Sequence, residues 1–245
     1  MASVSNASFA DQSFVVATGN SGKRREFATL LEDLLDPSWT VYDRETFPQP
    51  LEEVEETGST FEANAIKKAM ETVRQTGCCA LADDSGLIVD ALGGAPGVRS
   101  ARFAGEDASD DDNNQRLLQE LEGVADKDRT ARFVTVLCLA LPDNGVARKI
   151  LARRGLTRDE IPSAAPRNEA TLVRVADLVV IWFRGHFEGT IAEEPAGENG
   201  FGYDPLFVIP GDDHTHMAQL CREEKNRISH RACATKKLLA FFEGP

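Results

Sequence analysis

Residues 80–105 read "ALADDSGLIVDALGGAPGVRSARFAG" and set two adjacent aspartates, Asp83 and Asp84, between two apolar runs. The runs "CALAD" and "LIVDAL" predict two strands, with the Asp-Asp-Ser sequence as a turn between them. Neighbouring carboxylates repel one another, and a buried charge is costly unless it is compensated. The pair therefore indicates either a cation-binding site or an Asx turn that only ends a strand.

The patterns on both sides of this stretch predict strands and helices that alternate or mix. Strands are expected at 13–18, 131–141 and 177–185, which are rich in β-branched and aromatic residues. Helices are expected from Phe27, from Phe61 with Thr60 as N-cap, over 113–122 and from Ser229. This order favours an α/β protein with a mixed sheet and flanking helices.

Length and charge narrow the class of protein. The 245 residues suffice for one large domain or two closely joined lobes. The chain carries 27 Lys and Arg against 40 Asp and Glu, and this net charge of −13 opposes nonspecific binding to nucleic acid or an anionic membrane. Five cysteines without a CxxC pair, and no apolar run near the roughly 18 residues of a membrane span, predict a cytoplasmic protein.

A second candidate site is the sequence "TGNSGK", which follows the first expected strand. Backbone N–H groups at a helix N-terminus attract anions, glycines let a phosphate approach, and a lysine adds charge. The spacing is not that of a Walker A loop, and a plain turn with a solvated lysine is the alternative. The residues concerned are Thr18, Gly19, Asn20, Ser21, Gly22 and Lys23.

Three further segments carry candidate chemistry. The acidic run "LEEVEETG" at 51–58 suits Mg²⁺, although a solvated loop better explains most of its glutamates. The glycine-rich "GENGFGYDPLF" at 197–207 can present an aromatic face and a carboxylate to a base, or its aromatic side chains can pack in the core. "EEKNRISHR" at 223–231 places donors near the start of the final helix, where a structural histidine and a solvated arginine are the alternative.

Taken in order, five segments resemble the inosine/xanthosine triphosphate pyrophosphatase family, the non-canonical purine NTP pyrophosphatases. They are "ATGNSGKRREF", "TFEANAIKKA", "ADDSGLIVDALGGAPGVRSARFAG", "EEPAGENGFGYDPLF" and "EEKNRISHR". The resemblance spans about 14–239 and implies one domain, 1–245, with two lobes around a central nucleotide cleft. It also implies a homodimer that uses Mg²⁺ to hydrolyse ITP, XTP and dITP to the monophosphate and pyrophosphate, which sanitises the nucleotide pool.

The resemblance assigns roles by motif. Residues 18–23 would hold the triphosphate, and Ser85 would contact the substrate. Glu56 and Asp84 would bind Mg²⁺, and Asp84 would accept the proton of the attacking water. The nucleotide pocket would be formed by Phe201, Gly202, Tyr203, Asp204, Lys225, His230 and Arg231. The cation and nearby basic residues would then offset the repulsion between Asp83 and Asp84.

The chain departs from the family pattern at three places. Ala63 stands where a glutamate is usual, Arg99 replaces a common aromatic residue, and 143–177 is longer than the usual connection. Because loops tolerate insertions, we expect 143–177 to be a surface excursion without a catalytic role. Two other functions stay open: a pyrophosphatase for pyrimidine or canonical nucleotides, and a nucleotide-binding regulator that hydrolyses nothing.

Overall fold

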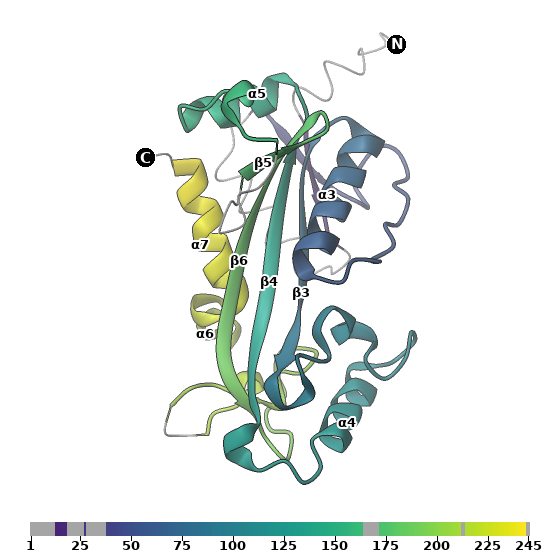
Figure 1. Cartoon of the computed structure of the whole chain (residues 1–245), viewed down its shortest axis with the longest axis vertical. Helices are drawn as coiled ribbons and strands as arrows, with labels where there is room; N and C mark the ends of the chain where they lie inside the picture. The colour runs from purple at the N-terminus through teal and green to yellow at the C-terminus, as the bar shows by residue number, and fades with distance from the viewer. Residues whose placement is uncertain (1–12, 19–26, 28–37, 164–171, 212–213, 244–245) are drawn as a thin grey trace.

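A seven-stranded sheet forms the centre of the computed structural model, which describes residues 13–18, 27, 38–163, 172–211 and 214–243 (Figure 1). The strand order is β2-β1-β3-β4-β6-β5, and β7 pairs with β6. The strands are β1 (Ser13–Ala17), β2 (Thr40–Asp43), β3 (Cys79–Val89), β4 (Thr130–Leu141), β5 (Leu172–Val175), β6 (Leu178–Ile191) and β7 (Phe207–Val208). Strand β1 runs parallel to β2 and β3, and the other pairs are antiparallel. The expected mixed sheet is confirmed.

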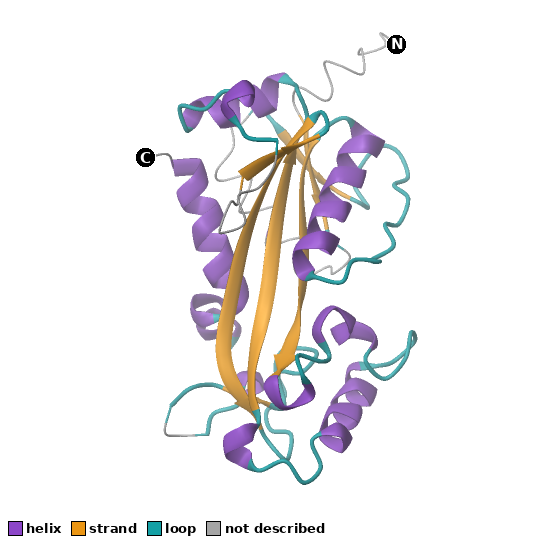
Figure 2. Ribbon diagram, in the orientation of Figure 1, coloured by secondary structure: helices purple, strands orange, loops and turns teal. Residues whose placement is uncertain are grey.

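Helices cover both faces of the upper part of the sheet (Figure 2). One face packs against α3 (Phe61–Thr76), and the other packs against α7 (His230–Glu243), which α6 (Arg222–Ile228) precedes. As predicted, Thr60 caps α3, because its side chain accepts the N–H of Ala63. Apolar side chains on α3 and α7 then bury two separate layers of core against the sheet.

The expectation of a turn between two short strands at Asp83 and Asp84 is wrong. Residues Cys79–Val89 form one continuous strand, and its pairing with β4 runs unbroken from Ala80↔Ala140 to Val89↔Ala131. The pairing with β1 ends earlier, at Ala17↔Ala82. Apolar neighbours on both sides keep the two aspartates within the ladder, so the Asx turn is also excluded.

The long strands β3, β4 and β6 extend into a second, lower lobe. This lobe holds the 3₁₀ segments η2 (Gly97–Arg102) and η5 (Met217–Gln219), the helix α4 (Asp110–Glu120) and β7. Its core includes Leu87, Leu117, Leu121 and Phe207, all buried. Segment η2 lies directly on β3 at Gly86, where an added Cβ would meet the Ser100 Oγ at 2.4 Å. The two expected lobes are therefore joined by strands rather than by a linker.

The segment 143–177 is more than a surface excursion, and that expectation is wrong for much of it. Helix α5 (Gly145–Arg153) begins at the cap Asn144 and buries Val146, Ile150 and Leu151 in the same core as α7. Strand β5 extends the sheet by pairing with β6. The amphipathic spacing of α5 explains why the insertion folds onto the sheet.

The helix expected from Phe27 and the expected lack of a membrane span can be compared only with the residues that the structure describes. Of the helix expected from Phe27, only Phe27 itself is described, and its side chain is buried. Within the described part of the chain, no helix combines the length and the apolar character that crossing a bilayer requires. All five cysteines are free thiols, and Cys78, Cys79 and Cys138 are buried.

Candidate active site

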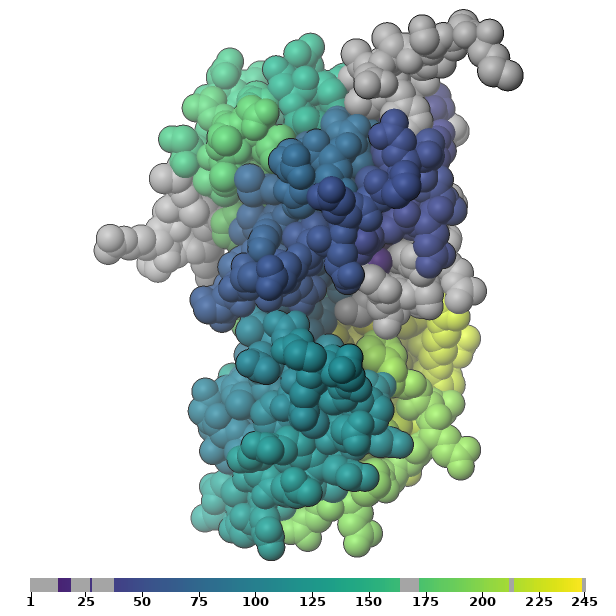
Figure 3. Space-filling view, turned by 90° about the vertical axis from the view of Figure 1, so that its right-hand side faces the viewer, coloured from purple at the N-terminus to yellow at the C-terminus, as the bar shows by residue number. Residues whose placement is uncertain are grey.

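A cleft of about 400 Å³ opens where the upper and lower lobes meet, at the waist of the molecule in Figure 3. It brings together most of the residues predicted from the sequence and described in the structure. They are Thr18, Glu56, Asp83, Asp84, Ser85, Phe201, Gly202, Tyr203, Asp204, Lys225 and His230. Residues Gly19, Asn20, Ser21, Gly22 and Lys23 lie outside the described residues, so their predicted role stays a prediction.

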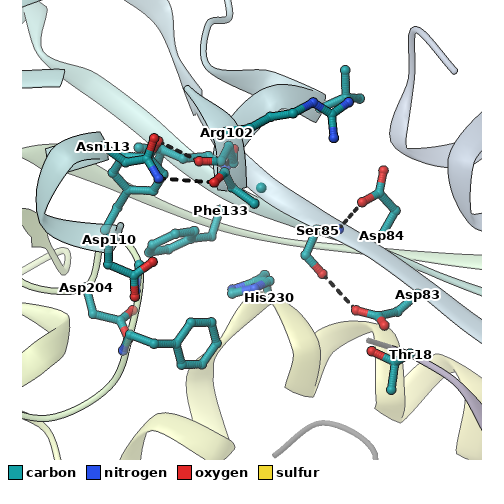
Figure 4. A pocket seen from close by; sticks show the side chains of 18 of the residues that line it. Thr18, Asp83, Asp84, Ser85, Arg102, Asp110, Asn113, Phe133, Asp204 and His230 are labelled. Atoms are coloured by element: carbon teal, nitrogen blue, oxygen red, sulfur yellow. Dashed lines mark hydrogen bonds between the residues drawn. The ribbon is translucent and has the colours of Figure 1, made fainter. Parts of the chain in front are cut away.

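The two aspartates on β3 face opposite sides of the sheet, because successive side chains alternate along a strand. Asp84 lies on the α3 side, where its Oδ2 accepts a hydrogen bond from Asn64 Nδ2 at 3.0 Å. Asp83 lies on the other side, where its Oδ2 accepts from Ser85 Oγ at 3.3 Å. Figure 4 shows the two carboxylates directed apart. Strand geometry thus keeps the neighbouring charges apart.

Lys68 links two of the predicted carboxylates. Its Nζ lies 2.6 Å from Glu56 Oε1 and 3.9 Å from Asp84 Oδ1. Burial alone would lower the pKa of Lys68, but the charges of Asp83, Asp84 and Glu56 outweigh it and raise that pKa. The ammonium therefore stays protonated, which makes it a fixed positive charge on the cleft wall.

The pKa of Asp84 is raised to about 6. Burial is the main cause, since the residue is only 6% exposed, and the charges of Glu56 and Asp83 add to it. Lys68 and the hydrogen bond from Asn64 act in the opposite direction. A carboxylate that lies inside a cleft and has a pKa near the operating pH has the properties of a general base.

Ser85 and Thr18 line the cleft on the Asp83 side of β3. The Ser85 Oγ lies 2.6 Å from Thr135 Oγ1 of β4, in addition to its bond to Asp83. Thr18 directly follows β1 and is buried. Both hydroxyls therefore stand where the β1 pairing stops and β3 continues into the cleft.

The other end of the cleft presents an aromatic ring, Phe201, that contacts two cations. Phe201 is 46% exposed, and the Lys225 Nζ and the Arg231 Cζ lie 4.7 Å and 5.3 Å from its ring centre. Asp204 holds this arrangement, because its Oδ2 accepts from the Phe201 N–H at 2.8 Å and forms an ion pair with Lys225. A flat ring with donors around it suits the stacking and edge recognition of a nucleobase.

Tyr203 follows the alternative interpretation and packs in the core. Its ring is 4% exposed, and its hydroxyl donates to the Ser100 carbonyl at 2.8 Å. Burial raises the pKa of Tyr203, so its hydroxyl stays protonated. The residue still lines the cleft, but as a wall that joins the 197–207 loop to η2.

The N-terminal turn of α7 places His230 in the wall of the cleft and Arg231 next to Phe201. The ring of His230 stacks on Phe133 of β4, with centroids 5.0 Å apart. Helix α7 approaches β6 closely at Gly185, where an added Cβ would meet the His230 carbonyl oxygen and the backbone of Ala234. Arg231 is buried and reaches the ring of Phe201, although it does not line the cleft itself.

Several residues of the cleft were not predicted from the sequence. Lys68 shares one face of α3 with Asn64 at i, i+4 spacing, which was a usable signal, although Lys67 next to it offered an equal candidate. Phe133 sits within an apolar strand that carries no sign of a site. The other missed lining residues include Val98, Ser100 and Arg102 on η2, and Asp110 and Asn113 on α4.

The three departures from the family pattern lie outside the cleft lining. Ala63 is exposed, and its neighbour Glu62 pairs with Arg184 of β6 at 2.5 Å. Arg99 is exposed at the surface near Glu106. The segment 143–177 contributes no lining residue among those described. None of the three changes a described contact of Asp84 or Phe201.

The sequence of this chain matches one family model and several named relatives. The Ham1 family model matches residues 14–161 and 147–241. A protein of Bacillus licheniformis named dITP/XTP pyrophosphatase is 42% identical over 236 residues, covering 94% of this chain and 97% of its own. A protein of the same name from Bacillus anthracis is 45% identical over 224 residues, covering 91% and 93%.

Solved structures agree with the sequence relatives. A HAM1 protein from Coxiella burnetii superposes with a TM-score of 0.71 at 38% identity, covering 93% of this chain and 96% of its own. The Staphylococcus aureus Ham1 protein superposes with a TM-score of 0.70 at 37% identity, covering 94% and 98%. The likeness extends over nearly the full length of this chain and of both solved chains.

Proposed function

This chain belongs to the Ham1 family, and on that premise we propose that it is a hydrolase that cleaves non-canonical purine nucleoside triphosphates to the monophosphate and pyrophosphate. ITP, dITP and XTP are the substrates, and their removal sanitises the nucleotide pool. Curated relatives at 42–45% identity are named dITP/XTP pyrophosphatases, and they align over more than nine-tenths of this chain.

One observation of the site carries the proposal. A single cleft holds Asp84 of β3 beside Lys68 of α3. Elsewhere on its wall, the exposed ring of Phe201 contacts the cation Lys225. The first group can act on a polyphosphate, and the second can hold a base. Ligands that combine a flat ring with a polyphosphate are nucleotides.

We infer that Mg²⁺ is the cofactor, held by Asp84 and Glu56. Glu56 and Asp84 lie 2.6 Å and 3.9 Å from Lys68 Nζ, and burial together with the negative charges of Glu56 and Asp83 raises the pKa of Asp84. That arrangement fits Mg²⁺, which typically uses one or two carboxylates and substrate phosphates.

The residues of the cleft suggest how the reaction proceeds. When bound, Mg²⁺ supplies positive charge to the phosphates and to the leaving pyrophosphate. Asp84, oriented by Asn64, accepts a proton from a water that attacks the α-phosphorus in line with the leaving group. Lys68 contributes a permanent positive charge beside Asp84. This charge offsets the repulsion between the carboxylates and the negatively charged phosphates of the substrate.

Base selection follows from the chemistry of the donors. Hypoxanthine and xanthine present a 6-oxo acceptor, whereas adenine presents an amino donor at that position. Lys225 and Arg231 can only donate, and His230 can donate from a ring nitrogen, so together they favour an oxo edge. Phe201 supplies the stacking surface.

We also propose a cytoplasmic homodimer. The dimer rests on the family resemblance alone, and light scattering of the purified protein measures it. The location rests on the five cysteines, an odd number without a CxxC pair, all of which are free thiols.

A product-resolved turnover screen tests the function. ITP, XTP, dITP, ATP, GTP and dUTP are each offered with Mg²⁺, and monophosphate, pyrophosphate and orthophosphate are quantified. We expect ITP, dITP and XTP to give pyrophosphate and monophosphate in equal amounts. Orthophosphate as the first product, or dUTP as the best substrate, would exclude the proposed activity.

A further inference from the structure

Helix α4 carries three polar side chains on one face, at the i, i+3, i+4 positions Asp110, Asn113 and Asn114. Each of them is hydrogen-bonded to the backbone of a segment that lines the cleft. Asp110 and Asn113 themselves line it (Figure 4). The helix belongs to the lower lobe, and the family motifs quoted above do not include it.

Two of these side chains hold both backbone groups of Gly202. The Gly202 N–H donates to Asp110 Oδ2 at 2.6 Å, and Asn114 Nδ2 donates to the Gly202 carbonyl at 2.9 Å. Gly202 has a φ of +61°, a conformation that glycine adopts without strain. The loop is thus tied to a rigid helix at the residue that follows Phe201.

Asn113 ties the same helix to the opposite wall of the cleft. Its Oδ1 accepts from the Ala104 N–H at 2.8 Å, and its Nδ2 donates to the Ala101 carbonyl at 3.2 Å. These two residues flank the end of η2. One helical face therefore fixes the distance between η2 and the 197–207 loop.

The Asn114 side chain bears a cost for this contact. Its Oδ1 is buried and accepts no hydrogen bond from the residues that the structure describes. An unpaired buried acceptor is unfavourable, and a protein that keeps one usually gains something from the same side chain. Here the gain is the contact of Nδ2 with Gly202.

We propose that Asp110 and Asn114 are positioning residues that set the affinity and the selectivity for the base by fixing Phe201 in the cleft. The inference rests on the proposed nucleotide substrate. A loop whose ring is held in place before binding loses less conformational freedom when the base stacks on it. Neither Asp110 nor Asn114 contacts Asp83 or Asp84 of β3, so the chemical step should proceed at its normal rate once substrate is bound.

Hydrogen exchange of the free protein tests the positioning without any substrate. In Asp110→Ala and Asn114→Ala, peptides spanning 197–207 should exchange at least several-fold faster than in the wild type. Asp110→Asn keeps an acceptor for Gly202 and should restore slow exchange. Asp111→Ala, which removes an exposed charge from the same helical turn, is the matched control. Unchanged exchange in both alanine variants would overturn the inference.

Kinetics on ITP and ATP complete the test. Asp110→Ala and Asn114→Ala should raise KM for ITP by about fivefold to tenfold, with kcat changed less than about twofold, and should reduce the ITP-to-ATP ratio of kcat/KM. A loss of kcat with KM unchanged would overturn the inference. If the wild type fails to hydrolyse ITP, the proposed function fails instead, whereas the exchange experiment still decides whether α4 holds the loop.

Discussion

Asn64 Nδ2 lies 3.0 Å from Asp84 Oδ2, and the Oδ1 of the same Asn64 accepts the N–H of Gly58 at 2.7 Å. One amide buried in α3 therefore joins the carboxylate on β3 to the loop that carries Glu56. The other oxygen of Asp84, Oδ1, accepts the Ser85 N–H at 3.0 Å and lies 3.9 Å from Lys68 Nζ. A fully buried side chain with both ends bonded cannot rotate, so the direction of the Asp84 carboxylate is fixed before substrate arrives.

We predict that Asp84→Asn folds normally but loses at least about 10³-fold in kcat with saturating Mg²⁺. The amide keeps the size of the side chain, but it has neither the charge nor the basicity that water activation requires. Steady-state turnover of ITP measures the loss, and circular dichroism confirms folding. Turnover within a few fold of the wild type would show that another residue is the base.

The same substitution should stabilise the protein in the absence of Mg²⁺ above about pH 6. The pKa of Asp84 is about 6 in the folded protein against 3.8, the ordinary value of an aspartate, so folding favours the protonated form. The stability that this preference contributes is fully present below pH 3.8 and is lost as the pH rises to about 6. Two pKa units correspond to on the order of 3 kcal/mol.

Urea unfolding in EDTA between pH 4 and pH 8 measures this effect. The free energy of unfolding of Asp84→Asn, relative to the wild type, should increase from pH 4 to about pH 6 and then stay level. Asp111→Asn, at an exposed position, controls for the loss of one carboxylate. A difference that does not change with pH would contradict the assigned cause.

Arg231→Ala should weaken the preference for ITP over ATP. If adenine binds at this site, its amino group faces side chains that can only donate, and these buried donors stay unpaired. Such a mismatch can lower kcat/KM by a factor of about 10⁴ relative to the matched substrate. We expect the ITP-to-ATP ratio to fall at least tenfold in the variant. Arg227→Ala, an exposed arginine four residues earlier, should leave the ratio unchanged. If Arg231→Ala keeps the wild-type ratio, other residues select the base.

Substitutions in α5 should reduce stability and spare catalysis. Ile150 is 1% exposed within the core shared with α7, so Ile150→Ala should lower the free energy of unfolding by about 3 kcal/mol and Ile150→Val by about 1 kcal/mol. The kcat of the folded variants should match the wild type, because no described residue of 143–177 lines the cleft. Equal stability of all three proteins would restore the interpretation of a dispensable excursion.

Much of the fold could be predicted from the sequence, because strand and helix patterns such as those of β4 and α3 are long and regular. The turn at Asp83 and Asp84 was mispredicted because charge normally ends a strand, whereas here the lobes meet at the middle of β3 and the cleft accommodates both side chains. The packing of α5 was missed because a departure from a family pattern carries no information about where the extra residues pack.

The site was predictable where residues stand together in sequence and not where folding alone unites them. Glu56, Asp84, Phe201 and Lys225 all stand in recognisable motifs, and the cleft contains all four. Lys68, Phe133 and Asp110 act through contacts made across long stretches of chain, such as the one between Asp110 and Gly202. A pattern along the chain cannot show such a contact, because it depends on how the lobes pack.

The three long strands have a mechanical consequence. The pairing of β4 with β6 runs unbroken from Thr130↔Thr190 to Leu141↔Val179, so one continuous hydrogen-bonded ladder spans both lobes. A hinge needs a few residues free to change φ and ψ by large amounts, and the residues of this continuous ladder are held by interstrand pairing. The angle between the lobes should therefore be nearly the same with and without nucleotide. Any fit to the substrate should come from segments at the margin of the cleft, such as 51–60 and 197–207.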